Sequence, residues 1–284
     1  MEILPLAAAL DPATPPRAGD LVHVESPINP YGEAFDISAY VAVARTAGAW
    51  TSVDATFGPP PLQDPLALGV DMVMHSGTKY IGGHSDMLCG ILAVNPQRAR
   101  DDKWAELLVE QRLHLGSVMG SFEGWLGLRS TRTVGLRVER QSRTAQALVD
   151  WIASALKTES VDANDENKAN NTAVAKVVAG IRHASQQPEA ADKDSWLYRQ
   201  MPHGFGAVFA ILMANEAQAR TLPSCLEIFQ HATSLGGVES LIEWRALSDK
   251  TIDKRLVRVS VGVESVEDLQ ADLQQAFARL AEMC

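Results

Sequence analysis

The sequence predicts an α/β fold in two parts: a mostly parallel sheet flanked by helices, and a smaller C-terminal α/β domain. Between residues 21 and 95, strand-like segments alternate with helix-like segments, and strands separated by helical crossovers are typical of parallel sheets. A second series of strand and helix patterns occupies residues 206–283. We therefore expect one part at 1–140 and a second at 141–284, which includes the helix linking the two.

The overall composition excludes several classes of partner. A chain of 284 residues can form one large domain and a smaller one, and 46% hydrophobic with 21% charged residues is typical of a soluble globular protein. The net charge of -10 disfavours binding to nucleic acid, which needs clustered Lys and Arg, and it is unfavourable at an anionic membrane. No apolar run is long enough to cross a bilayer. We expect neither nucleic acid nor membrane as a partner.

Cysteine usage and the N-terminus indicate the compartment. Cys89, Cys225 and Cys284 are few, odd in number and without metal-ligand spacing, which favours a reducing compartment without disulfides. The first apolar patch follows the acidic Glu2 and lacks a basic flank, so it does not resemble a signal peptide. The sequence predicts a cytoplasmic protein without a metal site.

The first elements follow from local patterns. Residues 20–26 are rich in Val and Leu and predict a short strand. Residues 36–48 predict a helix, because apolar residues recur at helical spacing and both ends carry suitable caps. Asp36 is the expected N-cap, and Gly48 is the expected end. Residues 49–57 predict the next strand.

The chain then enters a proline-rich loop before two more strands. Residues 58–65 contain three consecutive prolines and predict a stiff loop. Residues 66–76 predict a short helix end followed by a strand, and residues 87–94 predict another apolar strand. Ligands of parallel α/β sheets bind beyond the carboxyl ends of the strands, so the residues that follow these strands are candidates for a site.

The remaining chain alternates helices, a polar segment and further strands. Residues 100–157 predict a long helical region that is interrupted near 115–125. Residues 159–173 are polar and glycine-free, and they predict an exposed loop or insertion. Beyond it, the patterns predict strands at 206–213 and 256–263 and helices at 216–223 and 265–283.

The segment "HSGTKY" at 75–80 carries the most chemistry. Lys79 follows a predicted buried strand, where a partly desolvated lysine has a lowered pKa and can form a Schiff base with a carbonyl. The hydroxyls of Ser76 and Thr78 suit a bound phosphate, and Asp54, at the end of the neighbouring strand, suits a protonated ring nitrogen. Alone, each residue has a structural explanation: a solvated lysine or a turn-forming aspartate. Together they match the protein-side needs of pyridoxal phosphate.

Two other interpretations of this segment are disfavoured. Residues 76–79 also match S-x-x-K, the signature of penicillin-binding proteins, but its S-D-N and K-T-G partner strings do not occur. His75, His84 and Asp86 suggest a metal or triad site, but no H-x-x-x-H or C-x-x-C string supports one. We interpret "GGHSD" as a tight turn, in which the His and Asp side chains satisfy backbone groups.

Four longer segments resemble a known family. They are "VESPINPYGEAFDI", "SVDATFGPPPLQDPLALGVDMVMHSGTKYIGGHSDMLCG", "TSLGGVESLIEW" and "RLVRVSVGVESVEDL". The chain resembles, from about residue 20 to its C-terminus, the Cys/Met-metabolism pyridoxal-phosphate enzymes: the cystathionine γ-synthases, the cystathionine γ- and β-lyases and the methionine γ-lyases. "GPPPLQDP" and "SVMGSFEGWLGLRS" look most like the fungal cystathionine γ-synthase-like branch.

The resemblance implies a fold type I pyridoxal-phosphate transferase and assigns cofactor roles. It implies that Lys79 binds the cofactor aldehyde and that Asp54 pairs with the pyridine nitrogen. It also implies that Ser76 and Thr78 hold the phosphate. Asn29, in "INP", is then expected near the cofactor ring oxygen and the substrate carboxylate.

The same resemblance assigns substrate roles to the C-terminal segments. Arg258 is expected to bind the substrate carboxylate as a bidentate fork, which lysine cannot form as well. Ser234 is expected beside that carboxylate through its backbone or hydroxyl. Thr233 stands where cystathionine-handling members usually have glutamate, and Ala55 stands where asparagine or glycine is common.

The resemblance also implies the activity and its partners. We expect β/γ-elimination or γ-replacement on sulfur amino acids or activated homoserine, in a homo-oligomer that is a dimer of dimers in the family. The family's N-terminal arm, Gly-rich phosphate loop and ring-stacking tyrosine are not visible, and "MEILPL" looks like the middle of the family's large domain. An N-terminally truncated, non-catalytic fragment of the same family is therefore the alternative.

Overall fold

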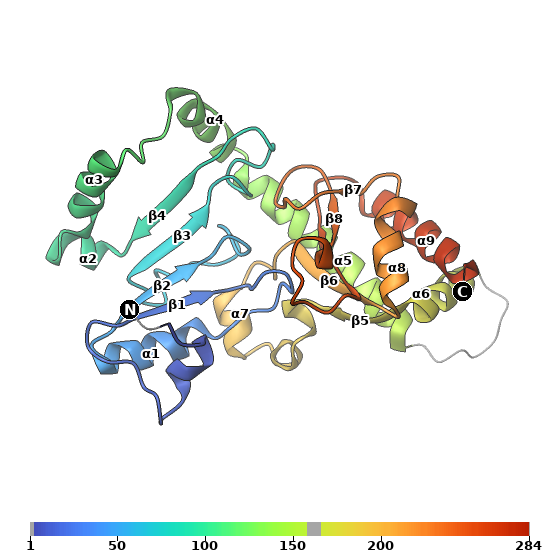
Figure 1. Cartoon of the computed structure of the whole chain (residues 1–284), viewed down its shortest axis with the longest axis horizontal. Helices are drawn as coiled ribbons and strands as arrows, with labels where there is room; N and C mark the ends of the chain where they lie inside the picture. The colour runs from blue at the N-terminus through green and yellow to red at the C-terminus, as the bar shows by residue number, and fades with distance from the viewer. Residues whose placement is uncertain (1–2, 158–165, 284) are drawn as a thin grey trace.

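The computed structural model describes residues 3–157 and 166–283, and its strands form two sheets (Figure 1). A four-stranded sheet has the order β1-β2-β3-β4, and a five-stranded sheet has the order β5-β6-β9-β8-β7. Helices flank both sheets, which confirms the predicted α/β class. We call residues 21–131 the first-sheet region and residues 134–283 the second-sheet region.

The first sheet is mostly parallel, as predicted. β1, β2 and β3 pair in parallel, whereas β4 runs antiparallel to β3 at the edge. Residues 77–89, which join β3 to β4, contain no crossover helix, so the chain simply reverses direction. The strand bounds are Leu21–Glu25 (β1), Trp50–Asp54 (β2), Met72–Ser76 (β3) and Gly90–Val94 (β4).

Helix α1 (Ile37–Ala47) covers one face of this sheet. The Asp36 carboxylate accepts a hydrogen bond from Ala39 N at 3.2 Å, and Gly48 ends the helix with a φ of 71°, so both predicted caps are confirmed. Alternate strand residues pack under the helix, in a core of Val22, Val24, Ile37, Tyr40, Val41, Ala44, Val53 and Val73. The opposite face, which we call the open face, leaves Leu21, His23 and Leu92 exposed.

Three helices beyond β4 form an arm at the edge of the molecule (Figure 1). They are α2 (Pro96–Asp101), α3 (Trp104–Leu115) and α4 (Ser121–Thr131). The interruption predicted near 115–125 is confirmed. Helix α3 buries none of its residues. Large apolar side chains are exposed along this arm: Leu107, Val109, Leu113, Leu115, Val118, Met119, Phe122, Trp125 and Leu128.

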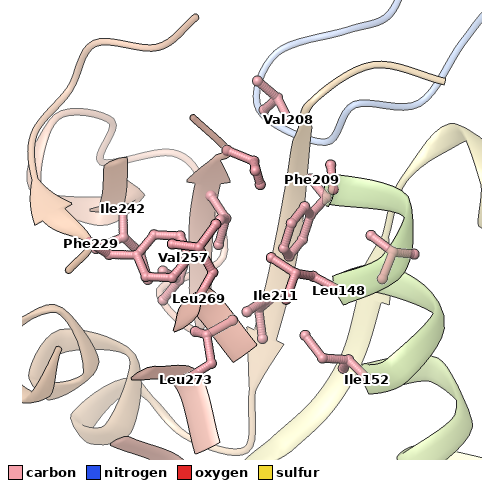
Figure 2. Packing of buried hydrophobic residues seen from close by; sticks show 14 of the residues in the cluster. Leu148, Ile152, Val208, Phe209, Ile211, Phe229, Ile242, Val257, Leu269 and Leu273 are labelled. Atoms are coloured by element: carbon pink, nitrogen blue, oxygen red, sulfur yellow. The ribbon is translucent and has the colours of Figure 1, made fainter. Parts of the chain in front are cut away.

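The second sheet lies beside a long helix, α5 (Val134–Lys157), and contains most of the hydrophobic core. Figure 2 shows Phe209 and Ile211 of β6 facing Leu148 and Ile152 of α5. The predicted boundary at 140 falls within α5. The other bounds are α6 (Glu166–Val177), β5 (Val178–Arg182), α7 (Trp196–Gln200), β6 (Val208–Met213), α8 (Glu216–Thr221), β7 (Gln230–His231), β8 (Leu241–Trp244), β9 (Leu256–Ser260) and α9 (Val266–Glu282).

Most of the other predicted elements are confirmed, and two predictions need correction. The exposed loop predicted at 159–173 is wrong from Glu166 onward, because α6 begins there; residues 158–165 lie outside the described residues. Val174 and Val177 of α6 are fully buried in the core, so tertiary packing overrides a weak local pattern. The helix end predicted before β3 is a hydrogen-bonded turn, in which Leu68 N donates to Pro65 O. Strands β5, β7 and β8 were not predicted.

Buried polar contacts join the two regions. Gln200 Nε2 donates to Gln63 Oε1 at 3.1 Å, and Gln63 Nε2 donates to Ser26 O at 2.8 Å. Tyr80, which follows β3, packs in the core of the second-sheet region, and Arg137 of α5 donates to its carbonyl at 2.7 Å. In the described ranges, no helix is both long and apolar enough to cross a membrane.

Candidate active site

The carboxyl ends of the three parallel strands meet at one edge of the first sheet. Glu25 ends β1, and its register partner Asp54 ends β2. Ser76 ends β3, and Lys79 follows in the next turn. The position predicted for a ligand, beyond these strand ends, is therefore where the candidate residues lie.

A compact turn holds Lys79 beyond β3. Lys79 N donates to Ser76 O at 3.0 Å, and Gly82 N donates to Gly77 O at 2.7 Å. Gly77 has no room for a side chain, because a Cβ there would lie 2.3 Å from Cys89 Sγ. The packing of Cys89 against this turn fixes the path of the backbone into Lys79.

The ammonium of Lys79 has no acidic partner among the described residues. Its Nζ lies 3.5 Å from Ser234 Oγ, and no carboxylate in the described part of the chain forms an ion pair with it. Burial lowers the pKa of Lys79, and the positive charge of Arg258 lowers it further. A lysine in this environment loses its proton more easily than a solvated one, which favours reaction with an aldehyde.

A loop from the second-sheet region brings Ser234 to Lys79. Gly236 has a φ of +78°, and a Cβ there would lie 2.8 Å from Tyr80 N. Gly236 N donates to Ser260 Oγ at 3.0 Å, which ties the loop to β9. Glycine is therefore required in "SLGG", both for its backbone conformation and for the close approach to the Lys79 turn.

Arg258 of β9 gathers the residues predicted to bind substrate. Its Nη2 donates to Thr233 O at 2.5 Å and to Ser234 O at 3.1 Å. Its Nη1 donates to Asn29 Oδ1 at 3.1 Å. Burial lowers the pKa of Arg258 to about 10, with the Glu243 carboxylate acting in the opposite direction. The structure thus places Asn29, Thr233, Ser234 and Arg258 in one cluster next to Lys79.

An acidic pair lies at the other side of the cluster. Glu25 Oε1 accepts from Asn29 N at 3.1 Å, and Asp54 Oδ1 accepts from Thr56 N at 2.9 Å. Burial raises the pKa of Glu25, and the neighbouring Asp54 charge raises it further. Sequence reasoning missed Glu25, although it ends β1 as Asp54 ends β2. Two adjacent carboxylates favour a cationic group beside them.

The two predicted phosphate hydroxyls have different environments. The Ser76 hydroxyl makes no hydrogen bond within the described residues, and Ser76 N donates to Thr56 Oγ1 at 2.8 Å. The Thr78 hydroxyl accepts from Cys89 N at 3.1 Å and donates to Cys89 O at 3.4 Å. Ser76 is therefore available to a ligand, whereas Thr78 would have to exchange a backbone partner.

Of the two histidines beside this turn, His84 contacts the backbone and His75 is buried. His84 Nδ1 lies 2.7 Å from Gly82 O, as expected for the predicted tight turn; the corresponding contact predicted for Asp86 is not found in the described part of the chain. His75 is buried, and burial lowers its pKa. Within the described ranges, no group of three or more His, Cys, Asp or Glu is arranged to hold a metal ion.

This arrangement agrees with what comparison with known proteins finds. The profile of the Cys/Met metabolism PLP-dependent enzymes matches residues 6–278. The chain belongs to this family. Cystathionine gamma-synthase of Mycobacterium tuberculosis is 36% identical over 281 residues, covering 96% of this chain and 64% of that protein. Cystathionine beta-lyase of Lactococcus lactis subsp. cremoris is 34% identical over 269 residues, covering 91% and 63%.

The solved structures of this PLP-dependent family share the fold. Cystathionine gamma synthase from Xanthomonas oryzae pv. oryzae, in complex with aminoacrylate and cysteine, has a TM-score of 0.78 and 33% identity, covering 98% of this chain and 66% of that chain. The predicted family and fold type I are confirmed, and the fungal branch stays a prediction. The chain spans just under two thirds of the length of these relatives.

The residues of the chain fit the family's cofactor, pyridoxal 5'-phosphate. Lys79 has a lowered pKa and, within residues 3–157 and 166–283, no acidic partner, which suits binding of the aldehyde. The Glu25 and Asp54 carboxylates suit a protonated pyridine nitrogen. The unbonded Ser76 hydroxyl suits a phosphate oxygen.

Proposed function

We propose that this protein is a pyridoxal-phosphate-dependent enzyme of the transsulfuration type. It acts on sulfur amino acids or activated homoserine by γ-replacement or β/γ-elimination, in the manner of cystathionine γ-synthases and lyases. The observation that carries the proposal is the Lys79 ammonium, which lies 3.5 Å from Ser234 Oγ and has no acidic partner in the part of the chain that the structure describes. The adjacent guanidinium of Arg258 supplies a cation for the carboxylate of an amino acid.

In this proposal, the first-sheet region holds the cofactor. Lys79 binds its aldehyde, Asp54 with Glu25 meets its ring nitrogen, and Ser76 and Thr78 bind its phosphate. When bound, pyridoxal phosphate supplies an electron-withdrawing ring that stabilises negative charge at the substrate α-carbon. The Lys79 amine would take up and release protons at substrate carbons, a task for which its lowered pKa is suited.

The second-sheet region, together with Asn29 of the first-sheet region, orients the substrate. Arg258 and Asn29 bind the α-carboxylate, and Ser234 lies between that position and Lys79. Thr233 is exposed and uncharged, and it offers no carboxylate to a distal ammonium group. Substrates with an uncharged γ-substituent, such as methionine or an O-acyl homoserine, are therefore favoured over cystathionine.

The proposal includes the setting of the enzyme. We divide the chain into a cofactor-binding domain at 1–140 and a C-terminal domain at 141–284 that includes the linking helix. The enzyme acts as a homo-oligomer on a small amino-acid substrate, without nucleic acid or membrane as a partner. Cys89 and Cys225 are free cysteines, which suits the reducing cytoplasm.

Borohydride trapping tests the proposal. The chain is incubated with pyridoxal phosphate, reduced with borohydride and digested, and the modified peptide is identified by mass spectrometry. We expect the label on Lys79, with Lys79→Arg as the control that abolishes it. Labelling of Lys103 or Lys250 in place of Lys79, or labelling without a preferred lysine, would contradict the proposal.

A further inference from the structure

A buried carboxylate lies behind Arg258. Glu243 of β8 is the register partner of Arg258 on β9, and its side chain is only 1% exposed. Its Oε2 lies 2.7 Å from Arg258 Nη2. Arg245 Nη1 donates to the same oxygen at 3.1 Å, and Ser248 Oγ donates to Oε1 at 2.5 Å. The carboxylate is thus held by two guanidinium groups and one hydroxyl.

This network uses the two amino groups of Arg258 unequally. Nη2 faces three protein oxygens, those of Glu243, Thr233 and Ser234. Nη1 makes one hydrogen bond within the described residues, to Asn29 Oδ1. Because each amino group carries two hydrogens, Nη1 retains a donor, whereas Nη2 is fully used.

The charges of the cluster explain why a carboxylate is buried beside Arg258. Burying Arg258 without a partner would be costly, because its guanidinium is always charged near neutral pH. The negative charge of Glu243 neutralises the positive charge of Arg258, and Arg245 adds one positive charge to the group. The three charges sum to +1, so the cluster keeps an attraction for an anion while Arg258 is held in a single orientation.

We propose that Glu243 is a positioning residue that directs Arg258 toward the α-carboxylate of the amino-acid substrate. Glu243 fixes the Nη2 side, and Arg245 and Ser248 fix Glu243 from the loop after β8. Nη1 is left beside Asn29 with a free donor. The inference rests on the proposed function, since it assumes that Arg258 binds the substrate carboxylate.

A matched pair of ligands tests this inference. L-Norvaline and n-butylamine differ only in the carboxylate, and both are titrated by calorimetry into the full chain saturated with pyridoxal phosphate. Glu243→Gln should raise the Kd of norvaline about ten- to a hundredfold, the range expected for weakening a charge-assisted contact. The Kd of butylamine should stay unchanged. A general structural defect would weaken both ligands alike.

Asp253→Asn is the matched control. It removes the ion pair between Asp253 and Arg255, which has a similar separation of 2.8 Å but is exposed on both sides. This variant should bind both ligands as the wild type does. If Glu243→Gln does not fold, Ser248→Ala removes only the hydroxyl that holds Glu243, and it should weaken norvaline a few-fold and butylamine not at all.

A second readout needs no cofactor. The Nε–H signal of Arg258 in an NMR spectrum, assigned with Arg258→Lys, should exchange with solvent faster in Glu243→Gln. If the wild type prefers norvaline over butylamine, and Glu243→Gln shows the same preference and the same exchange rate of the Arg258 Nε–H, this inference alone is overturned. Equal loss of both ligands in that variant also overturns it. A wild type without preference for norvaline overturns the proposed function as well.

Discussion

The two sheets differ in how completely they are covered. All five residues of β9 are buried, because helices pack on one side of the second sheet and the cluster around Arg258 lies on the other. β1 buries only Val22 and Val24, and the open face and the arm expose apolar side chains to solvent. The second-sheet region therefore contains most of the buried apolar packing, and the first-sheet region carries Lys79, the proposed catalytic lysine, on a less completely covered sheet.

The largest expected effect is on the free energy of unfolding, and it distinguishes the buried core of the second-sheet region from the exposed apolar side chains of the arm. Phe209→Ala opens a cavity in the second-sheet core, where Phe209 is fully buried, and should lower the free energy of unfolding by about 3–5 kcal/mol. Leu113→Ala, in the arm, should change it by less than about 0.5 kcal/mol, because Leu113 is 65% exposed. Urea denaturation measures both, and equal losses would show that the arm is packed against something in solution.

The next effect concerns the cofactor side of the comparison. Asp54→Ala should weaken pyridoxal-phosphate binding by about 1.5–3 kcal/mol, or about ten- to a hundredfold, because a charge-assisted contact to the ring nitrogen is lost. Asp64→Ala is the control, since Asp64 is exposed and accepts only from the nearby Leu66 and Ala67 amides. Absorbance titration gives both dissociation constants, and similar values would remove Asp54 from the cofactor site.

A third effect tests the substrate side. Thr233→Glu adds a carboxylate where cystathionine-handling members of the family usually have one, and it should shift the kcat/KM ratio of cystathionine to methionine upward. The shift should be nearer ten- than a hundredfold, because Thr233 is exposed and solvent screens the new charge. The ratio is measured on the cofactor-saturated protein. If the wild type already favours cystathionine and Thr233→Glu does not change the ratio, then this position does not select the substrate.

The smallest effect is a pH dependence at the boundary between the regions. The pKa of Lys79 is lowered by burial and by Arg258, so the folded protein loses this proton at a lower pH than a free lysine does. Acetylation of Lys79 in the cofactor-free chain should therefore rise with pH below the ordinary lysine value of about 10.4. Competitive labelling followed by mass spectrometry gives the profile. An apparent pKa at or above that value would mean that the site is more hydrated than the structure shows.

Local signals were sufficient for the elements whose causes are local. Helix α1 carries its N-cap Asp36 and its terminal Gly48 in the sequence itself, and α9 shows a clear apolar period. Strands β5 and β8 were missed because they are only five and four residues long and lack a clear alternating apolar pattern. Helix α6 was missed because its burial depends on α5 and α9 rather than on its own composition.

The site divides in the same way. The positions of Lys79, Asp54, Ser76 and Thr78 at the strand ends could be predicted because each follows or ends a strand with a visible apolar pattern. The residues around Arg258 required the resemblance, since Asn29 and Arg258 are separated by 229 positions and meet only in the fold. Glu25 and Glu243 were missed because an acidic residue in a strand is unremarkable until its cross-strand partner is known.

The burial of Tyr80 determines which parts of the site would move together. Tyr80 packs in the core of the second-sheet region, and Arg137 donates to its carbonyl at 2.7 Å, so the backbone after Lys79 is attached to α5. In mechanical terms, Lys79 is attached to both regions, through Ser76 O of β3 on one side and through Tyr80 on the other. A hinge motion between the regions would therefore strain the turn that contains the lysine. It would also break the contact between Arg258 Nη1 and Asn29 Oδ1, which crosses the same boundary.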